Sequence, residues 1–439
     1  MVRRSWGAAR RHPASGAVLA GIVCAVPTLV YAAWGPALIV DDWALAAGAR
    51  FLRWHEFLRA ERPVAFVWFL VTYRLLGTSP VAVALLMAVL NAVVGGLFWT
   101  AARSMLQRRA AVLATAAWAV LANRGATRLW APTGGQMLAL GGILAALLLA
   151  RSAAPTVARH AAVIAIGCAC VLSYEGAAGL AAGVVALSAW HLSGRARWLA
   201  LGAGGAALAA SAALALAASA KSGQAFAATG NWVSAQLGTG ILPSAVAPVG
   251  MVLVVFVVAW AGATAALPSF RTGSEERLVL IGAGVAALGI APFVASGFPV
   301  GTDGLFDRGN LYADVGTALV VAGGLGLLWR VLSARVATTV AAVVLTVLAS
   351  QNVVDVRAFH HAGVDGRRLL ASVDRLPRQL RTRGPLVLPD LPNRSGVSMF
   401  VEDYDIAAAL AIRYDTGIPY PDATMAVVAA RHRAERVSP

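Results

Sequence analysis

Long apolar runs, separated by short loops that carry arginine, make up most of the 439-residue sequence. A helix needs about 20 such residues to cross a bilayer, and most of the runs approach that length. Because the hydrocarbon holds no water to satisfy backbone groups, these runs must be helical. We therefore predict about eleven transmembrane helices, at residues 16–34, 81–102, 110–122, 134–150, 161–173, 176–191, 197–219, 248–267, 279–297, 312–330 and 336–350.

Two parts of this pattern allow a second interpretation. Residues 62–76 are apolar but short for a span, so they are expected to be interfacial or re-entrant. Residues 161–173 and 176–191 count as two spans here, but their spacing also fits one long tilted helix.

The arginines predict the orientation of the chain in the membrane. Residues 1–13 hold Arg3, Arg4, Arg10 and Arg11 and no acid, which places the N-terminus in the cytoplasm. Every loop that then falls inside carries arginine, at Arg103, Arg108, Arg109, Arg151, Arg159, Arg195, Arg197, Arg271, Arg277, Arg330 and Arg335. We expect a multi-pass protein of the cell (plasma) membrane.

A change of composition after residue 350 divides the chain. Residues 1–350 form the predicted transmembrane domain, whereas 351–439 hold ten of the twenty acids. This second part contains a strand-like segment at 385–389 and a helix-like one at 403–412. By topology we expect it to be a small extracytoplasmic α/β domain, which either recognises a substrate or covers the outer face.

Composition excludes several classes of protein. With 59% hydrophobic residues and a mean hydropathy of +0.73, the chain is not soluble. The net charge of +16 suggests nucleic-acid binding, but the arginines lie in short loops between spans and no nucleic-acid module accompanies them. Cys24, Cys168 and Cys170 lie inside apolar runs and cannot form the usual four-ligand metal site. Abundant Ala, Gly and Arg suggest a GC-rich bacterial genome.

The predicted topology sorts the acids unevenly. Of the ten before residue 350, only Glu275 and Glu276 fall inside, and eight fall on or near the outer face. The orientation rule does not require this, because acids contribute little to it. These eight are Asp41, Asp42, Glu56, Glu61, Glu175, Asp303, Asp307 and Asp314. An acidic outer face indicates chemistry or cation handling there.

The first outer loop, residues 34–62, opens with the adjacent acids Asp41 and Asp42. Apolar residues then recur every three or four positions on one face of a predicted helix, at Trp43, Ala47, Phe51, Trp54 and Leu58. An aromatic face flanked by arginine is typical of a helix lying in the membrane interface. The alternative for the acids is a solvated pair that only marks a helix end.

Three further outer segments carry candidate functional groups. They contain Asn123, Arg124 and Arg128; Tyr174 and Glu175; and Asp307, Arg308, Asn310, Tyr312 and Asp314. Arginine forks match the oxygens of a lipid phosphate, and a nearby carboxylate can deprotonate an incoming hydroxyl. This combination predicts transfer of a sugar from a lipid phosphate to an alcohol. Simpler alternatives are a loop acid at a tight turn for Glu175 and a snorkelling arginine for Arg308.

The order of these features resembles the GT-C superfamily of membrane glycosyltransferases, which includes protein O-mannosyltransferases and bacterial lipid-sugar transferases. In that family an acidic pair, an interfacial helix and a His-Pro or Arg-Pro-like step follow the first span. A Lys/Tyr-Glu step and a late arginine come further along the chain. The matching elements here are Asp41-Asp42, the helix 43–58, Arg62-Pro63, Tyr174-Glu175 and Arg308, within roughly residues 16–330.

The resemblance implies an undecaprenyl- or decaprenyl-phosphate sugar donor, inversion at the anomeric carbon and catalysis on the outer face. Asp41 corresponds to the usual base, and Asp42 stays open because the pair here is Asp-Asp. Arg308 with Arg124 or Arg128 is expected to bind the donor phosphate. The expected supporting residues are Glu175, Tyr174, Arg62, Asp307 and Asn310. Metal dependence stays open, with Mg²⁺ or Mn²⁺ as candidate ions.

The expected partners are a polyprenyl-phosphate sugar, membrane lipid, and a glycan, lipid or protein acceptor. A transporter or flippase of lipid-linked sugars is the main alternative, although it would place charges within spans and often show internal repeats. A polymerase or ligase acting on lipid-linked glycans would look much the same as a glycosyltransferase. A non-catalytic scaffold gives no account of the acidic outer face.

Overall fold

The computed structural model describes residues 13–51, 64–121, 124–151, 156–219, 274–296, 304–375, 397 and 403–415. Within these ranges seven helices are long and apolar enough to cross a membrane, and three shorter apolar helices accompany them. The protein is therefore a multi-pass α-helical membrane protein, in agreement with the class predicted from the sequence.

Only seven of the described helices are long and apolar enough to span a membrane, so the predicted count of about eleven stays a prediction. The described helices overlap the predicted apolar runs. They are α1 (Pro13–Trp34), α2 (Asp41–Phe51), α4 (Ala65–Phe69), the π-helix η2 (Leu70–Leu75), α5 (Pro80–Met105), α6 (Arg108–Val120), α7 (Gly125–Leu129), η3 (Ala131–Thr133), α8 (Gly134–Arg151), α9 (Val157–Ser173), η4 (Glu175–Ala177), α10 (Ala178–Trp190), α11 (Gly194–Ser219), α14 (Ser274–Ser296), η6 (Gly304–Asn310), α15 (Leu311–Val331), α16 (Ala334–Asp374) and α18 (Asp403–Tyr414). The predicted span 248–267 lies outside the described residues.

Two expectations are resolved by these bounds. Residues 161–173 and 176–191 form separate helices, α9 and α10, so the alternative of one long tilted helix is wrong. A break at Tyr174 separates them, because its extended backbone ends α9 before the short turn η4 begins. The segment 62–76 is short as expected, with α4 and η2 covering residues 65–75.

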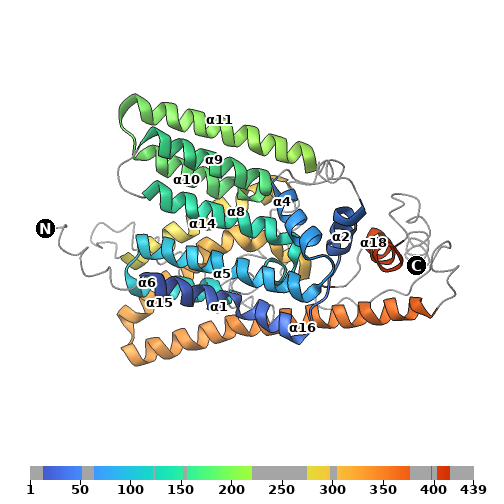
Figure 1. Ribbon diagram of the computed structural model, residues 1–439. Helices are drawn as coiled ribbons and strands as arrows, with labels where there is room; N and C mark the ends of the chain where they lie inside the picture. The colour runs from blue at the N-terminus through green and yellow to red at the C-terminus, as the bar shows by residue number, and fades with distance from the viewer. Residues whose placement is uncertain are drawn as a thin grey trace, which may run out of the picture.

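The predicted domain boundary at residue 350 falls inside a helix. α16 runs without interruption for 41 residues, from Ala334 to Asp374. Its second half extends past the bundle toward α18 (Figure 1). The predicted helix at 403–412 is confirmed as α18, and the predicted strand at 385–389 lies outside the described residues.

Contacts between neighbouring helix ends gather several arginines at one end of the bundle. Arg151 donates a hydrogen bond to the carbonyl oxygen of Ser104 at 3.1 Å, and the Arg109 guanidinium lies 4.1 Å from the centre of the Trp329 ring. Arg330 pairs with Glu276. All of these residues lie near helix ends whose connecting loops the sequence predicts to be inside, and the folded chain groups them at one end; their orientation in the membrane stays a prediction.

Small residues let α14 and α15 pack with their backbones in close approach. Gly282 and Gly289 on α14, like Gly316 and Gly323 on α15, are seven residues and thus about two turns apart. A Cβ atom at Gly282 would lie 2.7 Å from the carbonyl oxygen of Gly316. This is the small-residue contact by which helices associate in lipid. It fixes the position of η6, which leads directly into α15.

A separate apolar cluster closes the opposite end, where α2 and α18 lie together (Figure 1). It joins Tyr31 of α1, Ile39, Trp130 and Phe359 of α16, with Ala409 of α18. The Tyr31 hydroxyl also accepts a hydrogen bond from the Ala37 amide at 3.0 Å. The segment that carries Asp41 and Asp42 is thus packed between membrane helices and the C-terminal helices.

Candidate functional site

A tight turn presents the acidic pair at the start of α2. The Asp42 amide donates to the Ile39 carbonyl oxygen at 3.1 Å, and the Ile39 amide donates to the Asp42 carboxylate at 2.8 Å. Between them Val40 has a φ of +48°. A β-branched side chain rarely adopts this left-handed conformation, which costs free energy and persists only where the surroundings impose it. The turn before Asp41 is therefore strained and held by its neighbours.

The two acids of the pair lie in different environments. Asp42 is 2% exposed, and Tyr73 of η2 donates a hydrogen bond to its carboxylate. Burial raises the pKa of Asp42 to about 7, although the hydrogen bonds from Ile39 and Tyr73 act in the opposite direction. Asp41 is partly exposed. Of the two acids, Asp41 is therefore the one that is open to solvent.

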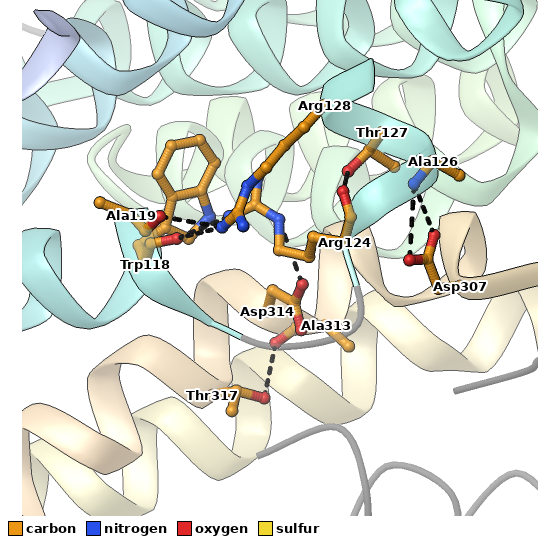
Figure 2. Close-up of polar contacts among 10 residues, drawn as sticks. All are labelled: Trp118, Ala119, Arg124, Ala126, Thr127, Arg128, Asp307, Ala313, Asp314 and Thr317. Carbon is orange, nitrogen blue, oxygen red and sulfur yellow. Dashed lines mark hydrogen bonds and ion pairs between the residues drawn. The ribbon is translucent and has the colours of Figure 1, made fainter. Parts of the chain in front are cut away.

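Arg124 and Arg128 lie inside the protein, against the C-terminal end of α6 (Figure 2). Arg124 donates to the Trp118 carbonyl oxygen at 2.7 Å, and Arg128 donates to the Ala119 carbonyl oxygen at 2.9 Å. Carbonyls at the end of a helix lack intrahelical donors, and arginine commonly supplies them. The two guanidinium groups therefore cap α6.

Opposite charge and an aromatic face complete the surroundings of Arg124. Its Nε lies 3.4 Å from the Asp314 carboxylate, and its guanidinium lies 4.0 Å from the centre of the Trp118 ring. Burial lowers the pKa of Arg124 to about 9, and the neighbouring Arg128 adds to this effect. Arg124 is 1% and Arg128 2% exposed, and their contact with a donor phosphate stays a prediction.

Asp307 also has an internal role. It is fully buried and accepts a hydrogen bond at 3.1 Å from the Ala126 amide, in the first turn of α7 (Figure 2). A carboxylate here satisfies an amide that the helix leaves without a partner. Asn310 is buried as well. Asp307 thus joins η6 to α7, and neither side chain reaches the solvent-exposed surface.

Arg308, between these two buried residues, is partly exposed. Its guanidinium lies 5.2 Å from the centre of the Trp130 ring. The indole nitrogen of Trp130 donates to the Ile39 carbonyl oxygen at 3.0 Å. Through Trp130, Arg308 is thus linked to the turn that carries Asp41. Trp130 therefore contacts both the arginine predicted to bind phosphate and the turn that precedes the predicted base, although the two are far apart in the sequence.

Tyr174 and Glu175 lie where α9, α14 and α15 meet. Tyr174 is buried, with its ring centroid 6.0 Å from that of Phe293 and 6.3 Å from that of Tyr312. Glu175 begins η4 and is partly exposed. Tyr174 therefore anchors the turn by packing, and Glu175 is presented at its surface. Arg62 and Asn123 lie outside the described residues.

Three residues of this region were not singled out from the sequence. Tyr73 lies in a short apolar segment, Trp130 in a segment whose arginines drew attention, and Asp405 in the predicted helix of the tail. Asp405 is fully buried, and its charge contributes to the raised pKa of Asp42. Their proximity to residues 39–42 is visible only in the folded chain, where segments far apart in the sequence lie together.

Metal ligands are not apparent in the described part of the chain. There, no three His, Cys, Asp or Glu side chains come close enough together to hold a metal ion. The structure therefore names no residues for Mg²⁺ or Mn²⁺.

Comparisons with known proteins give one structural similarity. No protein-family model and no curated protein matches the sequence. The fold is similar to that of the Archaeoglobus fulgidus oligosaccharyltransferase, whose crystal structure contains Zn and sulfate, with 15% sequence identity and a TM-score of 0.40. The alignment covers 89% of this chain, which spans 61% of the length of that protein. At this level, the similarity carries no argument about the site.

Proposed function

We propose that this protein is an integral membrane glycosyltransferase. In this proposal it moves a sugar from a polyprenyl-phosphate donor to an acceptor hydroxyl, on the extracytoplasmic face and with inversion. The observation that carries the proposal is the partly exposed Asp41, linked through Trp130 to the partly exposed Arg308. A base and a phosphate-binding cation are the two groups that this reaction needs.

The reaction follows from the properties of these two side chains. Asp41 takes the proton of the acceptor hydroxyl while its oxygen attacks the anomeric carbon, on the side opposite the phosphate. The bond between that carbon and the phosphate oxygen breaks, and its electron pair leaves with the phosphate. Arg308 binds the phosphate and stabilises the charge that develops on it. Glu175 orients the donor.

The buried residues have a supporting part in this proposal. Arg124, Arg128, Asp307 and Asn310 fix η6 and α7 against the bundle, which sets the position of Arg308. Rigid elements hold reacting groups more accurately than mobile loops do. Tyr174 holds Glu175 in the same way.

One observation favours the alternative of a transporter or flippase of lipid-linked sugars. Arg124 and Asp314 form a buried charge pair among the helices, and such pairs mark transport pathways in some membrane proteins. Both side chains are enclosed and Arg124 donates to the Trp118 carbonyl oxygen of α6, as in a structural pair. The experiment below separates the two functions.

Transfer by the purified protein in lipid nanodiscs tests the proposal. The protein is offered a panel of polyprenyl-phosphate sugars with native lipid and protein extracts, and products are followed by mass spectrometry. We expect a new glycan mass with the wild type and a loss of about 100-fold or more in Asp41→Asn. Arg308→Ala is expected to raise the KM for the donor and to lower kcat.

Two exposed residues provide matched controls. Asp415 pairs with Arg50 and is 72% exposed, and Arg335 is exposed at the opposite end of the bundle. Asp415→Asn and Arg335→Ala are expected to transfer sugar as the wild type does. If the wild type consumes no donor, the proposal is wrong and translocation of lipid-linked sugar becomes the next assay.

A further inference from the structure

The Asp42 carboxylate is held on both of its oxygens. One oxygen accepts the Ile39 amide at 2.8 Å, and the other accepts the hydroxyl of Tyr73. Tyr73 is 3% exposed and belongs to the π-helix η2 (Leu70–Leu75). π-helical turns are rare and are often found at functional sites. This turn aims Tyr73 at α2 from a neighbouring element.

These contacts account for the strained turn. Val40 keeps its φ of +48° because residues 39 and 42 are closed on each other by two hydrogen bonds. Without the Asp42 carboxylate, this ring of residues 39–42 keeps only its backbone hydrogen bond, from the Asp42 amide to the Ile39 carbonyl oxygen, and Val40 relaxes more readily toward an ordinary conformation. Asp41 lies between the strained residue and Asp42, so the direction of its side chain depends on the ring.

We propose that Tyr73 and Asp42 are positioning residues that hold Asp41 toward the acceptor, and that Asp42 does not itself take the acceptor proton. The inference rests on the proposed glycosyl transfer. An acceptor hydroxyl could bind Asp42 only by displacing Tyr73 or the Ile39 amide from a site that is closed to solvent. Tyr73 keeps its proton throughout the reaction.

Four variants separate positioning from proton transfer. Asp41→Asn removes the base. Asp42→Asn keeps an oxygen for the Ile39 amide and a group that can bond to the Tyr73 hydroxyl, whereas Asp42→Ala keeps neither. Tyr73→Phe removes only the hydroxyl. Tyr414→Phe is the matched control, since it removes a Tyr–Asp hydrogen bond of 2.7 Å between α18 and the end of α16.

Kinetics in nanodiscs give the first measurement, per mole of folded protein. Small misplacement of a reacting group costs about 100-fold in rate. We therefore expect kcat to fall about 100-fold in Asp42→Ala and at least about tenfold in Tyr73→Phe, with the donor KM within about threefold. Asp42→Asn is expected to stay within about tenfold of the wild type, and Tyr414→Phe to match it. Asp41→Asn is expected to be inactive.

The outcomes distinguish this inference from the proposed function. If Asp42→Asn is as inactive as Asp41→Asn, Asp42 takes the proton and the inference is overturned. If Asp42→Ala and Tyr73→Phe match the wild type, neither residue positions Asp41. If the wild type transfers no sugar from any donor, it is the proposed function that fails.

Amide hydrogen exchange tests the turn itself, whatever the activity. The Ile39 amide is expected to exchange slowly in the wild type and in Asp42→Asn. In Asp42→Ala and Tyr73→Phe its exchange should be about tenfold faster, as follows from losing one hydrogen bond to a carboxylate. Equal exchange in all of these variants would show that the ring does not hold the turn, and the inference would fail on structural grounds.

Discussion

The buried pair of Arg124 and Asp314 gives a sharp test of how charge is accommodated in this bundle. Arg124 is 1% exposed and Asp314 is fully buried, with 3.4 Å between the Nε and the carboxylate. Removing one partner of such a pair leaves an uncompensated buried charge and costs about 3–5 kcal/mol. We expect Asp314→Leu to fall in this range, because Arg124 also lies beside the like charge of Arg128.

Replacing both partners should cost far less than the two single changes suggest. Arg124→Met keeps an unbranched chain in contact with the Trp118 ring, and Asp314→Leu then no longer leaves a charge behind. A buried pair exchanged for apolar groups of similar size is often neutral or stabilising. We therefore expect a coupling free energy of about 2 kcal/mol or more in the double-mutant cycle.

Equilibrium unfolding in mixed detergent micelles measures all four proteins. The exposed pair Arg50–Asp415, with side chains 48% and 72% exposed, serves as the control cycle and should couple by less than about 1 kcal/mol. If the buried cycle couples no more strongly than the exposed one, Asp314 does not compensate Arg124.

Three further predictions concern stability. Burial raises the pKa of Asp42 from 3.8 to about 7. The contribution of its protonated form to stability is therefore complete below about pH 4 and is lost as the pH rises to about 7. The thermal unfolding temperature of Asp42→Asn should lack this dependence on pH. Gly316→Ala should cost about 3 kcal/mol or prevent folding, since a Cβ would clash with the backbone of Ala286. Gly284→Ala, with open space around it, should leave unfolding unchanged or slightly stabilised. Asp374→Ala, which frees Arg413, should speed amide exchange in 403–415 with little change in global unfolding, because the pair is partly exposed.

The positions of the helices could be predicted from the sequence for a simple reason. Apolar runs in lipid have no alternative to the helix, so hydropathy alone locates α1, α5, α8 and α15 within a few residues. Arginine in the intervening loops then predicts which loops gather at one end. Composition was less informative at residue 350, where the hydropathy falls but the backbone continues as α16. The change there marks the end of an apolar stretch and not the end of a helix.

The roles of the candidate site residues were harder to predict. Asp41 and Asp42 are neighbours of the same type, and only folding distinguishes them, by burying Asp42 against the Ile39 amide and the Tyr73 hydroxyl. Asp307 bonds to an amide 181 positions earlier in the chain, and such distant pairing leaves no local signal in a sequence. Arg124 and Arg308 likewise look alike until the packing shows that one is enclosed and the other is not.

The length of α16 connects the membrane mechanically to the candidate site. At 1.5 Å per residue, its 41 residues span about 60 Å, twice the thickness of the hydrocarbon core. One end of this rod follows α15, and the other carries Asp374, which holds α18 through Arg413. α18 in turn packs on α2. A thinner bilayer, which tilts a long helix such as α16 more strongly, is therefore expected to displace α18 relative to Asp41, so the acyl-chain length of the surrounding lipid becomes a mechanical input to the site.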